Sequence, residues 1–131
     1  MIFQRGRMQI TKHITIDITP NNGSLDIELK ASGKLKHGDY TIMIPMLKQA
    51  LKSMPNPKVN MLIDATEFQG WELEAVWDDF KFGIEYKDVF LKIAIVGTEK
   101  WQEYLTKIGS WFMHGKVKFF YDLNEAKVWI K

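Results

Sequence analysis

Residues 59–64 read Val-Asn-Met-Leu-Ile-Asp, and this stretch decides the fold class. Met61, Leu62 and Ile63 form a nearly continuous apolar run, whereas a strand with one solvated face alternates apolar and polar residues. Such a run is typical of a strand buried on both faces, usually within a parallel sheet covered by helices. We therefore expect a buried parallel strand that ends at Asp64, near the centre of an α/β sheet.

The chain on the C-terminal side of this strand alternates predicted helices and strands. Two more short apolar strands are expected, at 89–96 and 117–121. Apolar residues recur at spacings of three and four in the segments around them, which is typical of helices with one buried face. The predicted helices cover residues 40–54, 73–86, 98–112 and 123–130. We expect Asp39 to cap the first of them, Pro45 to kink or split it, and residues 68–71 to form a loop.

Two alternating segments precede the first helix. Residues 10–18 and 25–31 have apolar residues two apart, and Pro20-Asn21-Asn22-Gly23 between them has turn chemistry, so an antiparallel hairpin is predicted. Residues 32–38 are expected to form a solvated loop. The element order is therefore ββαβαβαβα, which predicts an α/β fold with a mixed, largely parallel sheet, an N-terminal hairpin and helices packed on the sheet. Without a repeat or linker, residues 1–131 are expected to form a single domain.

Composition excludes several classes of function. The 131 residues carry a net charge of only +2, without the dense basic stripe typical of nucleic-acid binders. No apolar run approaches the ~20 residues of a membrane span, and no signal region is evident, so a cytoplasmic protein is expected. The chain contains no cysteine, no glycine-rich phosphate loop and no histidines at metal-ligand spacing, so we expect neither a metal nor a cofactor.

Polar side chains are expected at one edge of the predicted sheet. Asp64 ends a buried strand and Thr66 follows it, while Thr98 and Lys100 follow the next parallel strand. Open α/β sheets place their ligand crevices at this carboxyl edge, so these four residues are candidate ligand-binding residues. The alternative is structural, with the Asp64 carboxylate bonded to the amides at a helix start.

The chain contains five tryptophans, and three of them form a second set of candidate residues. Trp71 and Trp111 lie in glycine-containing segments, and large apolar side chains in such segments often mark a pocket mouth or an interface. Trp101 follows Lys100 at the predicted sheet edge. These three tryptophans are therefore candidates for contact with an apolar ligand, and burial in the core is the alternative.

Several of these motifs resemble one known family. The residues that carry the resemblance are Gly38-Asp39-Tyr40 with Pro45, Leu62-Ile63-Asp64, Phe68-Gln69-Gly70-Trp71, Trp77-Asp78-Asp79-Phe80-Lys81, Ile93-Ala94-Ile95-Val96-Gly97, Lys100-Trp101 and Glu125-Ala126-Lys127-Val128-Trp129-Ile130. The set resembles the SpoIIAA-like family, small bacterial proteins related in fold to the STAS domain and loosely likened to CRAL-TRIO lipid carriers. The resemblance implies a mixed sheet with packed helices. It does not imply a phosphoserine switch, because Gln69-Gly70-Trp71-Glu72 offers no serine where STAS antagonists carry one.

These observations lead to two main hypotheses. The first is a non-catalytic binding module whose apolar mouth lies between the loops after Asp64, Val96 and Tyr121 and accepts an apolar small molecule, a lipid or a membrane surface. The alternative is a protein-interaction module, or a homodimer, that docks through residues 72–86. Trp77, Asp79 and Phe80 are the candidate interface residues. An enzyme with Asp64 as general base is not expected, because no paired acid or oxyanion group is evident.

Overall fold

The computed structural model describes residues 7–72, 74–75, 78, 81–82, 85–86, 88–98 and 116–131. It contains strands β1 (Met8–Gln9), β2 (Ile14–Asn21), β3 (Ser24–Leu35), β4 (Val59–Trp71), β5 (Phe90–Val96) and β6 (Lys116–Phe120), and helices α1 (His37–Lys52) and α4 (Leu123–Ile130). Between β4 and β5, the described residues 74–75, 78, 81–82 and 85 have helical backbone. Most of the helix predicted at 98–112 lies outside the described residues. No helix in the described part of the chain is both long and apolar enough to span a bilayer.

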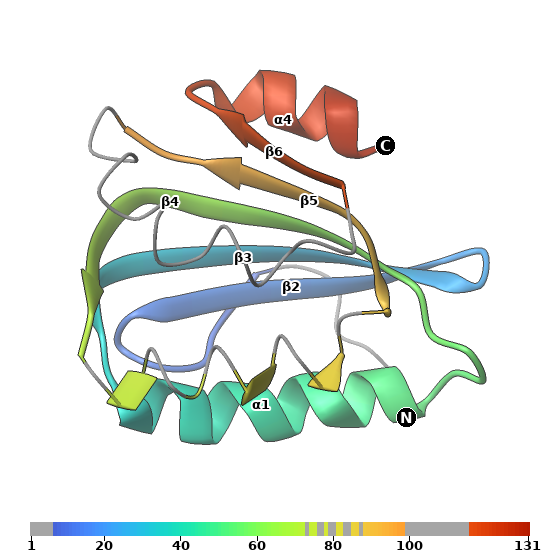
Figure 1. The fold of residues 1–131 in the computed structure, drawn as a ribbon, viewed down its shortest axis with the longest axis horizontal. Helices are drawn as coiled ribbons and strands as arrows, with labels where there is room; N and C mark the ends of the chain where they lie inside the picture. Colours follow the sequence, from blue (N-terminus) through green and yellow to red (C-terminus); the bar gives the residue numbers. More distant parts are fainter. Residues whose placement is uncertain are drawn as a thin grey trace.

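The six strands form one mixed sheet in the order β1-β2-β3-β4-β5-β6 (Figure 1). The β1–β2 and β2–β3 pairs are antiparallel, and the β3–β4, β4–β5 and β5–β6 pairs are parallel. Asn22 and Gly23 both have positive φ, as a two-residue type I′ hairpin turn requires. The predicted α/β class, the mixed sheet and the N-terminal hairpin are therefore confirmed.

The sheet is covered by helices on opposite faces. Met61 of β4 belongs to the larger core cluster with the buried stripe of α1, whereas its neighbour Leu62 belongs to a smaller cluster with Ala126 of α4. Successive strand residues point to opposite faces, so α1 and α4 lie on opposite sides of the sheet. Figure 1 shows α1 along one side of the sheet and α4 beyond β6. The double-sided burial of β4 explains its continuous apolar run.

β4 is longer than the sequence predicted. It continues to Trp71, so the predicted strand end at Asp64 and the predicted loop at 68–71 are both wrong. β4 stops pairing with β5 at Asp64, but it remains paired with β3 as far as Leu35 and Trp71. β3 likewise runs to Leu35 through residues predicted to be a loop. Two register shifts along the pair accompany the curvature of both strands towards α1 in Figure 1.

The ends and interior of α1 also differ from expectation. Lys36 is the N-cap rather than Asp39, which is the N3 residue and accepts a hydrogen bond from the Lys36 amide at 2.8 Å. The helix is not split at Pro45 but runs unbroken from His37 to Lys52. Pro45 and Thr41 are both exposed, so solvent can reach the Thr41 carbonyl, to which proline cannot donate a hydrogen bond. The buried stripe on the opposite side holds the helix against the sheet.

Candidate functional site

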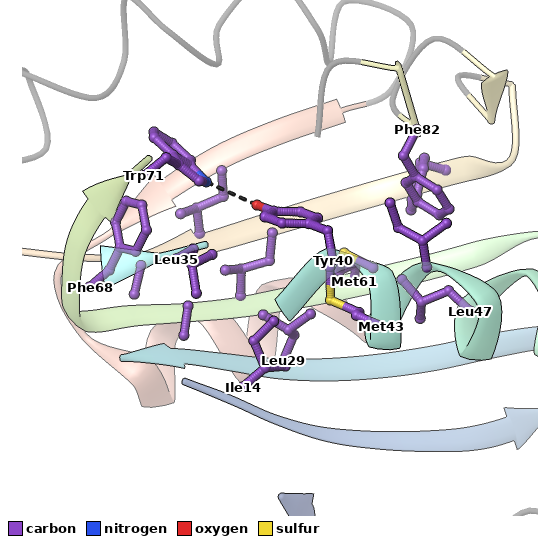
Figure 2. A pocket seen from close by; sticks show the side chains of 16 residues that line it. Ile14, Leu29, Leu35, Tyr40, Met43, Leu47, Met61, Phe68, Trp71 and Phe82 are labelled. Carbon is purple, nitrogen blue, oxygen red and sulfur yellow. Dashed lines mark hydrogen bonds between the residues drawn. The ribbon is translucent and has the colours of Figure 1, made fainter. Parts of the chain in front are cut away.

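An apolar pocket of about 110 Å³ lies between α1 and the face of the sheet that α1 covers (Figure 2). Strand residues form its floor, α1 forms one wall, and Phe82 contributes from the helical segment between β4 and β5. Among the described residues, the lining consists of Ile14, Leu29, Ala31, Leu35, Tyr40, Met43, Ile44, Leu47, Met61, Ile63, Ala65, Phe68, Trp71, Phe82, Phe90 and Ile95. All sixteen side chains are aliphatic, aromatic or thioether, so the pocket disfavours charged ligands.

The periodicity of the elements brings these side chains together. Tyr40, Met43, Ile44 and Leu47 are spaced i, i+3, i+4 and i+7, so they form one stripe along α1. The lining residues of β3 and β4 are mostly two apart, as expected for side chains on one face of a sheet.

Two alanines widen the space at the floor. Lys30 of β3 is paired with Asp64 of β4. Ala31 and Ala65 are the next residues on these two strands, so they occupy neighbouring positions on adjacent strands. Both line the pocket. The small side chains lie beside the register shift between Lys30 and Ser32, where the regular ladder is interrupted. We attribute part of the pocket's volume to this pair, because larger residues here would fill the gap below α1.

The pocket has one polar feature among the described lining residues. The Trp71 indole Nε1 donates a hydrogen bond to the Tyr40 hydroxyl at 2.9 Å, as Figure 2 shows. Trp71 also packs edge-on against Phe68, with ring centroids 4.6 Å apart. Tyr40 is only 2% exposed, so the bond lies in a largely dry environment. Its position links the end of β4 to the first turn of α1.

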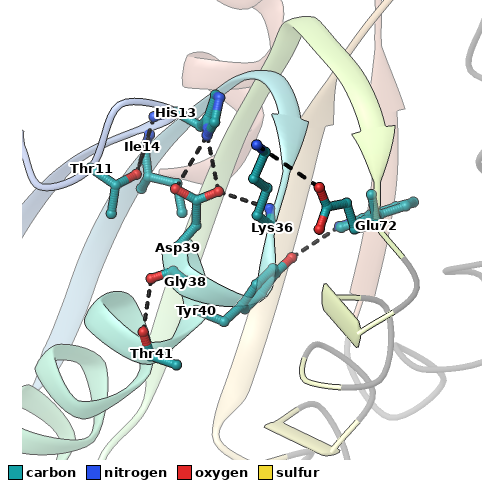
Figure 3. Close-up of polar contacts among 10 residues, drawn as sticks. Thr11, His13, Ile14, Lys36, Gly38, Asp39, Tyr40, Thr41 and Glu72 are labelled. Atoms are coloured by element: carbon teal, nitrogen blue, oxygen red, sulfur yellow. Dashed lines mark hydrogen bonds and ion pairs between the residues drawn. The ribbon is translucent and has the colours of Figure 1, made fainter.

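A charged cluster fixes the first turn of α1 beside the pocket (Figure 3). The Asp39 carboxylate is 6% exposed, and one of its oxygens lies 3.0 Å from His13 Nδ1. Burial on its own raises the pKa of Asp39, but hydrogen bonds from the Lys36 amide, the Thr11 hydroxyl and His13 outweigh burial, so the pKa is lowered. The ionised carboxylate therefore ties the start of β2 to α1, and it positions Tyr40, the next residue, over the pocket.

Ion pairs also connect α1 to the helical segment that carries Phe82. His37 Nδ1 bonds to Asp78, and this hydrogen bond raises the pKa of His37 above its ordinary value. Lys48 lies 3.2 Å from Glu85, about two turns beyond Asp78 on the same segment. These contacts are solvent-exposed, so each is expected to add little stability. Both contacts lie on the segment that carries Phe82, which lines the pocket.

The candidate residues from sequence analysis are not all placed together. Trp71 lines the pocket, but Asp64 and Thr66 do not. The Thr66 amide and hydroxyl both donate to Asp64 Oδ1, at 3.1 and 2.7 Å. Asp64 points to the face opposite Ile63 and Ala65, towards Arg7, Lys30 and Leu123.

The remaining candidates give less structural information. Thr98 is exposed and does not line the pocket. Lys100, Trp101 and Trp111 lie outside the described residues, as do the candidate interface residues Trp77, Asp79 and Phe80. Their binding and docking roles therefore stay predictions.

Sequence reasoning missed most of the pocket because apolar residues that line a cavity have the same pattern as those that fill a core. The helical stripe that contains Tyr40 was visible, but nothing in its spacing distinguishes a gap from close packing. The His13–Asp39 pair is separated by 26 residues and leaves no local signal. Within the part of the chain that the structure describes, no group of three or more acidic, histidine or cysteine side chains could hold a metal ion.

Comparisons with known proteins agree with this fold. A family model described as SpoIIAA-like matches residues 27–131. A crystal structure of an uncharacterised protein of the DUF3478 family from Shewanella loihica PV-4, described as having a SpoIIAA-like fold, is 38% identical to this chain. The match covers 95% of this chain and 99% of that one, with a TM-score of 0.77. A search of curated proteins finds no match. The resemblance inferred from the sequence motifs is thus confirmed, and the chain belongs to the SpoIIAA-like family.

Proposed function

We propose that this protein is a non-catalytic binding module that holds a small apolar molecule between α1 and the sheet. The observation that carries the proposal is the pocket of about 110 Å³, whose described lining is apolar except for the bonded Tyr40–Trp71 pair. A pocket without charged groups gains affinity from removing apolar surface from water. This is the ligand class expected from the sequence, but the proposed position lies under α1 rather than between the loops expected after Asp64, Val96 and Tyr121.

The volume of the pocket limits the size of the ligand that it can hold. An apolar cavity of about 150 Å³ lined by Leu, Ile and Phe stays dry and binds benzene. A space of about 110 Å³ accommodates one ring or a short alkyl chain rather than a whole phospholipid. A longer lipid would therefore place only part of its chain in the pocket. Membrane-surface binding stays a prediction from sequence.

A pair of leucine substitutions on β4 tests the proposal. Ala65 lines the pocket, whereas the next residue, Thr66, is exposed and points to the opposite face. Ala65→Leu should fill the pocket and abolish binding of toluene, measured by chemical-shift changes in a two-dimensional NMR titration. Thr66→Leu adds a leucine to the same strand outside the pocket, so it should bind toluene as the unmodified protein does.

Native mass spectrometry of the freshly purified protein provides an independent check. A bound mass that disappears on denaturation, and that is absent from Ala65→Leu, would support the pocket. The proposal is wrong if the unmodified protein shows neither a co-purified molecule nor toluene-induced shifts. It is also wrong if Ala65→Leu remains folded, by its melting temperature, and binds toluene unchanged.

A further inference from the structure

Aromatic side chains lie at both ends of the pocket rather than being gathered on one wall. Figure 2 shows Phe68 and Trp71 together at one end and Phe82 towards the other. Phe90 also lines the pocket, and its ring centroid lies 6.5 Å from that of Phe82. The aliphatic lining residues come mainly from the strands that form the floor. A ligand in this space therefore has aromatic rings near both of its ends.

These rings pack with the edge of one against the face of another. The ring planes of Phe68 and Trp71 are inclined at 68°, with centroids 4.6 Å apart, and those of Phe82 and Phe90 are inclined at 65°. Edge-to-face packing places the weakly positive edge of one ring on the negative face of the next. An aromatic ligand can extend this packing at either end of the pocket, whereas a saturated ring or chain has no π face with which to do so.

Two methionines in the lining have the same preference. Met43 lines the pocket from α1 and Met61 lines it from β4, and both side chains are buried. A thioether sulfur makes favourable contacts with an aromatic ring, and its unbranched side chain adapts to the shape of a neighbour. The helix wall and the sheet floor therefore both offer contacts that favour an aromatic ligand over a saturated one of equal size.

We infer that the pocket selects an aromatic ring over a saturated ring or alkyl chain of the same size, and that Phe82 is one of the residues that determine this specificity. The inference rests on the proposed function, since it concerns the same pocket, and it narrows the class of ligand. Burial of apolar surface by itself predicts the opposite order. A saturated ring has more apolar surface than the aromatic ring with the same carbon skeleton, so burial alone would favour the saturated one.

Toluene and methylcyclohexane test this distinction, because they share one carbon skeleton and differ only in the aromaticity of the ring. Both compounds are volatile, so headspace gas chromatography over protein solutions measures their dissociation constants, and toluene should bind the unmodified protein more tightly. Phe82 is the residue to substitute, because it lines the pocket and is only partly buried. We expect Phe82→Leu to weaken toluene binding by about 2- to 10-fold relative to methylcyclohexane binding, the range of one aromatic pair.

Ile44→Leu is the matched control for this substitution. Ile44 also lines the pocket and is partly buried, but the exchange keeps an aliphatic side chain of the same volume. It should therefore change the two dissociation constants by the same factor and leave their ratio as it is in the unmodified protein.

The outcomes separate the inference from the proposed function. If neither compound binds the unmodified protein, the pocket is not a binding site and both ideas fail. If methylcyclohexane binds at least as tightly as toluene, the aromatic preference is overturned and the apolar pocket stands. An equal effect of Phe82→Leu on both compounds overturns the role of Phe82. Should Phe82→Leu prove unfolded by its melting temperature, Phe68→Leu gives the second test, because loss of a ring at the other end should also weaken toluene more than methylcyclohexane.

Discussion

Asp39 is the buried charged residue of the described core. It is a nearly buried carboxylate at the N-terminal turn of α1, paired with His13 and bonded to the Lys36 amide. A helix N-terminus favours negative charge, and the capping bond satisfies an amide that has no partner within the helix. The sequence identified Asp39 as part of the helix start, but it placed the residue at the N-cap. Only the folded chain shows that its partner is His13, the residue before β2.

Asp39→Asn should destabilise the protein by about 1–2 kcal/mol at pH 7, because it removes the negative charge facing His13 and weakens the cap. The pKa of Asp39 is lowered in the folded state, so the unfolded state binds the proton more tightly. This stabilisation is therefore present above the ordinary carboxyl pKa and is lost as pH falls through the lowered value. Urea unfolding at pH 7 and at pH 3 should show the difference between the two proteins shrinking at acid pH.

Asp88→Asn serves as the control for this experiment, because Asp88 is exposed. It should change the free energy of unfolding by less than about 0.5 kcal/mol, as is usual for surface substitutions. The free energy of unfolding of Asp39→Asn is compared with that of the unmodified protein at each pH. If the difference stays constant with pH, the Asp39 side chain stabilises the fold through its shape rather than through its charge.

At the scale of elements, α1 combines a strong apolar stripe with an unfavourable interior proline. The stripe predicted the helix correctly, and the helix continues through Pro45 because packing of residues such as Met43 and Leu47 outweighs one missing hydrogen bond. The position of Pro45 on the exposed side makes this tolerance possible, since solvent can satisfy the carbonyl of Thr41. Propensity alone could not decide between a split helix and a continuous one.

Pro45→Ala should therefore stabilise the protein by about 1–3 kcal/mol, because proline is disfavoured by roughly 3 kcal/mol in a helix interior. Part of this gain is offset because the unfolded chain of the variant has more conformational freedom with alanine at position 45. Urea unfolding measures the change. Gln49→Ala, one turn further along the exposed side of α1, is the matched control and should change stability by only a few tenths of a kcal/mol. An unchanged or lower stability of Pro45→Ala would show that the native backbone of α1 depends on the proline.

β4 shows why strand length was harder to predict than strand existence. Its apolar centre was evident from Met61 to Ile63, but the half beyond Asp64 contains Gly70 and several polar residues. That half is held by the parallel pairing with β3, which extends to Leu35 and Trp71. The partner strand, rather than local preference, keeps these residues extended.

At the scale of the whole molecule, the alternative hypothesis concerns docking through residues 72–86. The described residues of this segment differ in burial, since Ala75 is buried and Glu74 is exposed. If this segment forms a homodimer seam, Trp77→Ala should lower self-association without unfolding the protein. Sedimentation velocity over a hundredfold range of concentration measures the association, and circular dichroism measures the fold.

Lys118→Ala is the control, since Lys118 is exposed on β6 and far in sequence from the seam. It should leave association unchanged. A monomer that shows no concentration dependence would eliminate the homodimer version of this hypothesis, and equal effects of both substitutions would argue against a specific seam.

Apolar periodicity in the sequence by itself determined the α/β class, the N-terminal hairpin, the helix at α1 and the short last helix, because the faces of strands and helices are local properties. The N-cap of α4 is likewise local, since the side-chain oxygen of Asp122 accepts from the amide of Asn124, two residues along. Only the tertiary structure decided where the chain leaves space. The pocket lies where the stripe of α1 faces two small strand residues, Ala31 and Ala65, and where Tyr40 and Trp71 meet across 31 positions of sequence. A cavity is a mismatch between two packed surfaces, and neither surface encodes it alone.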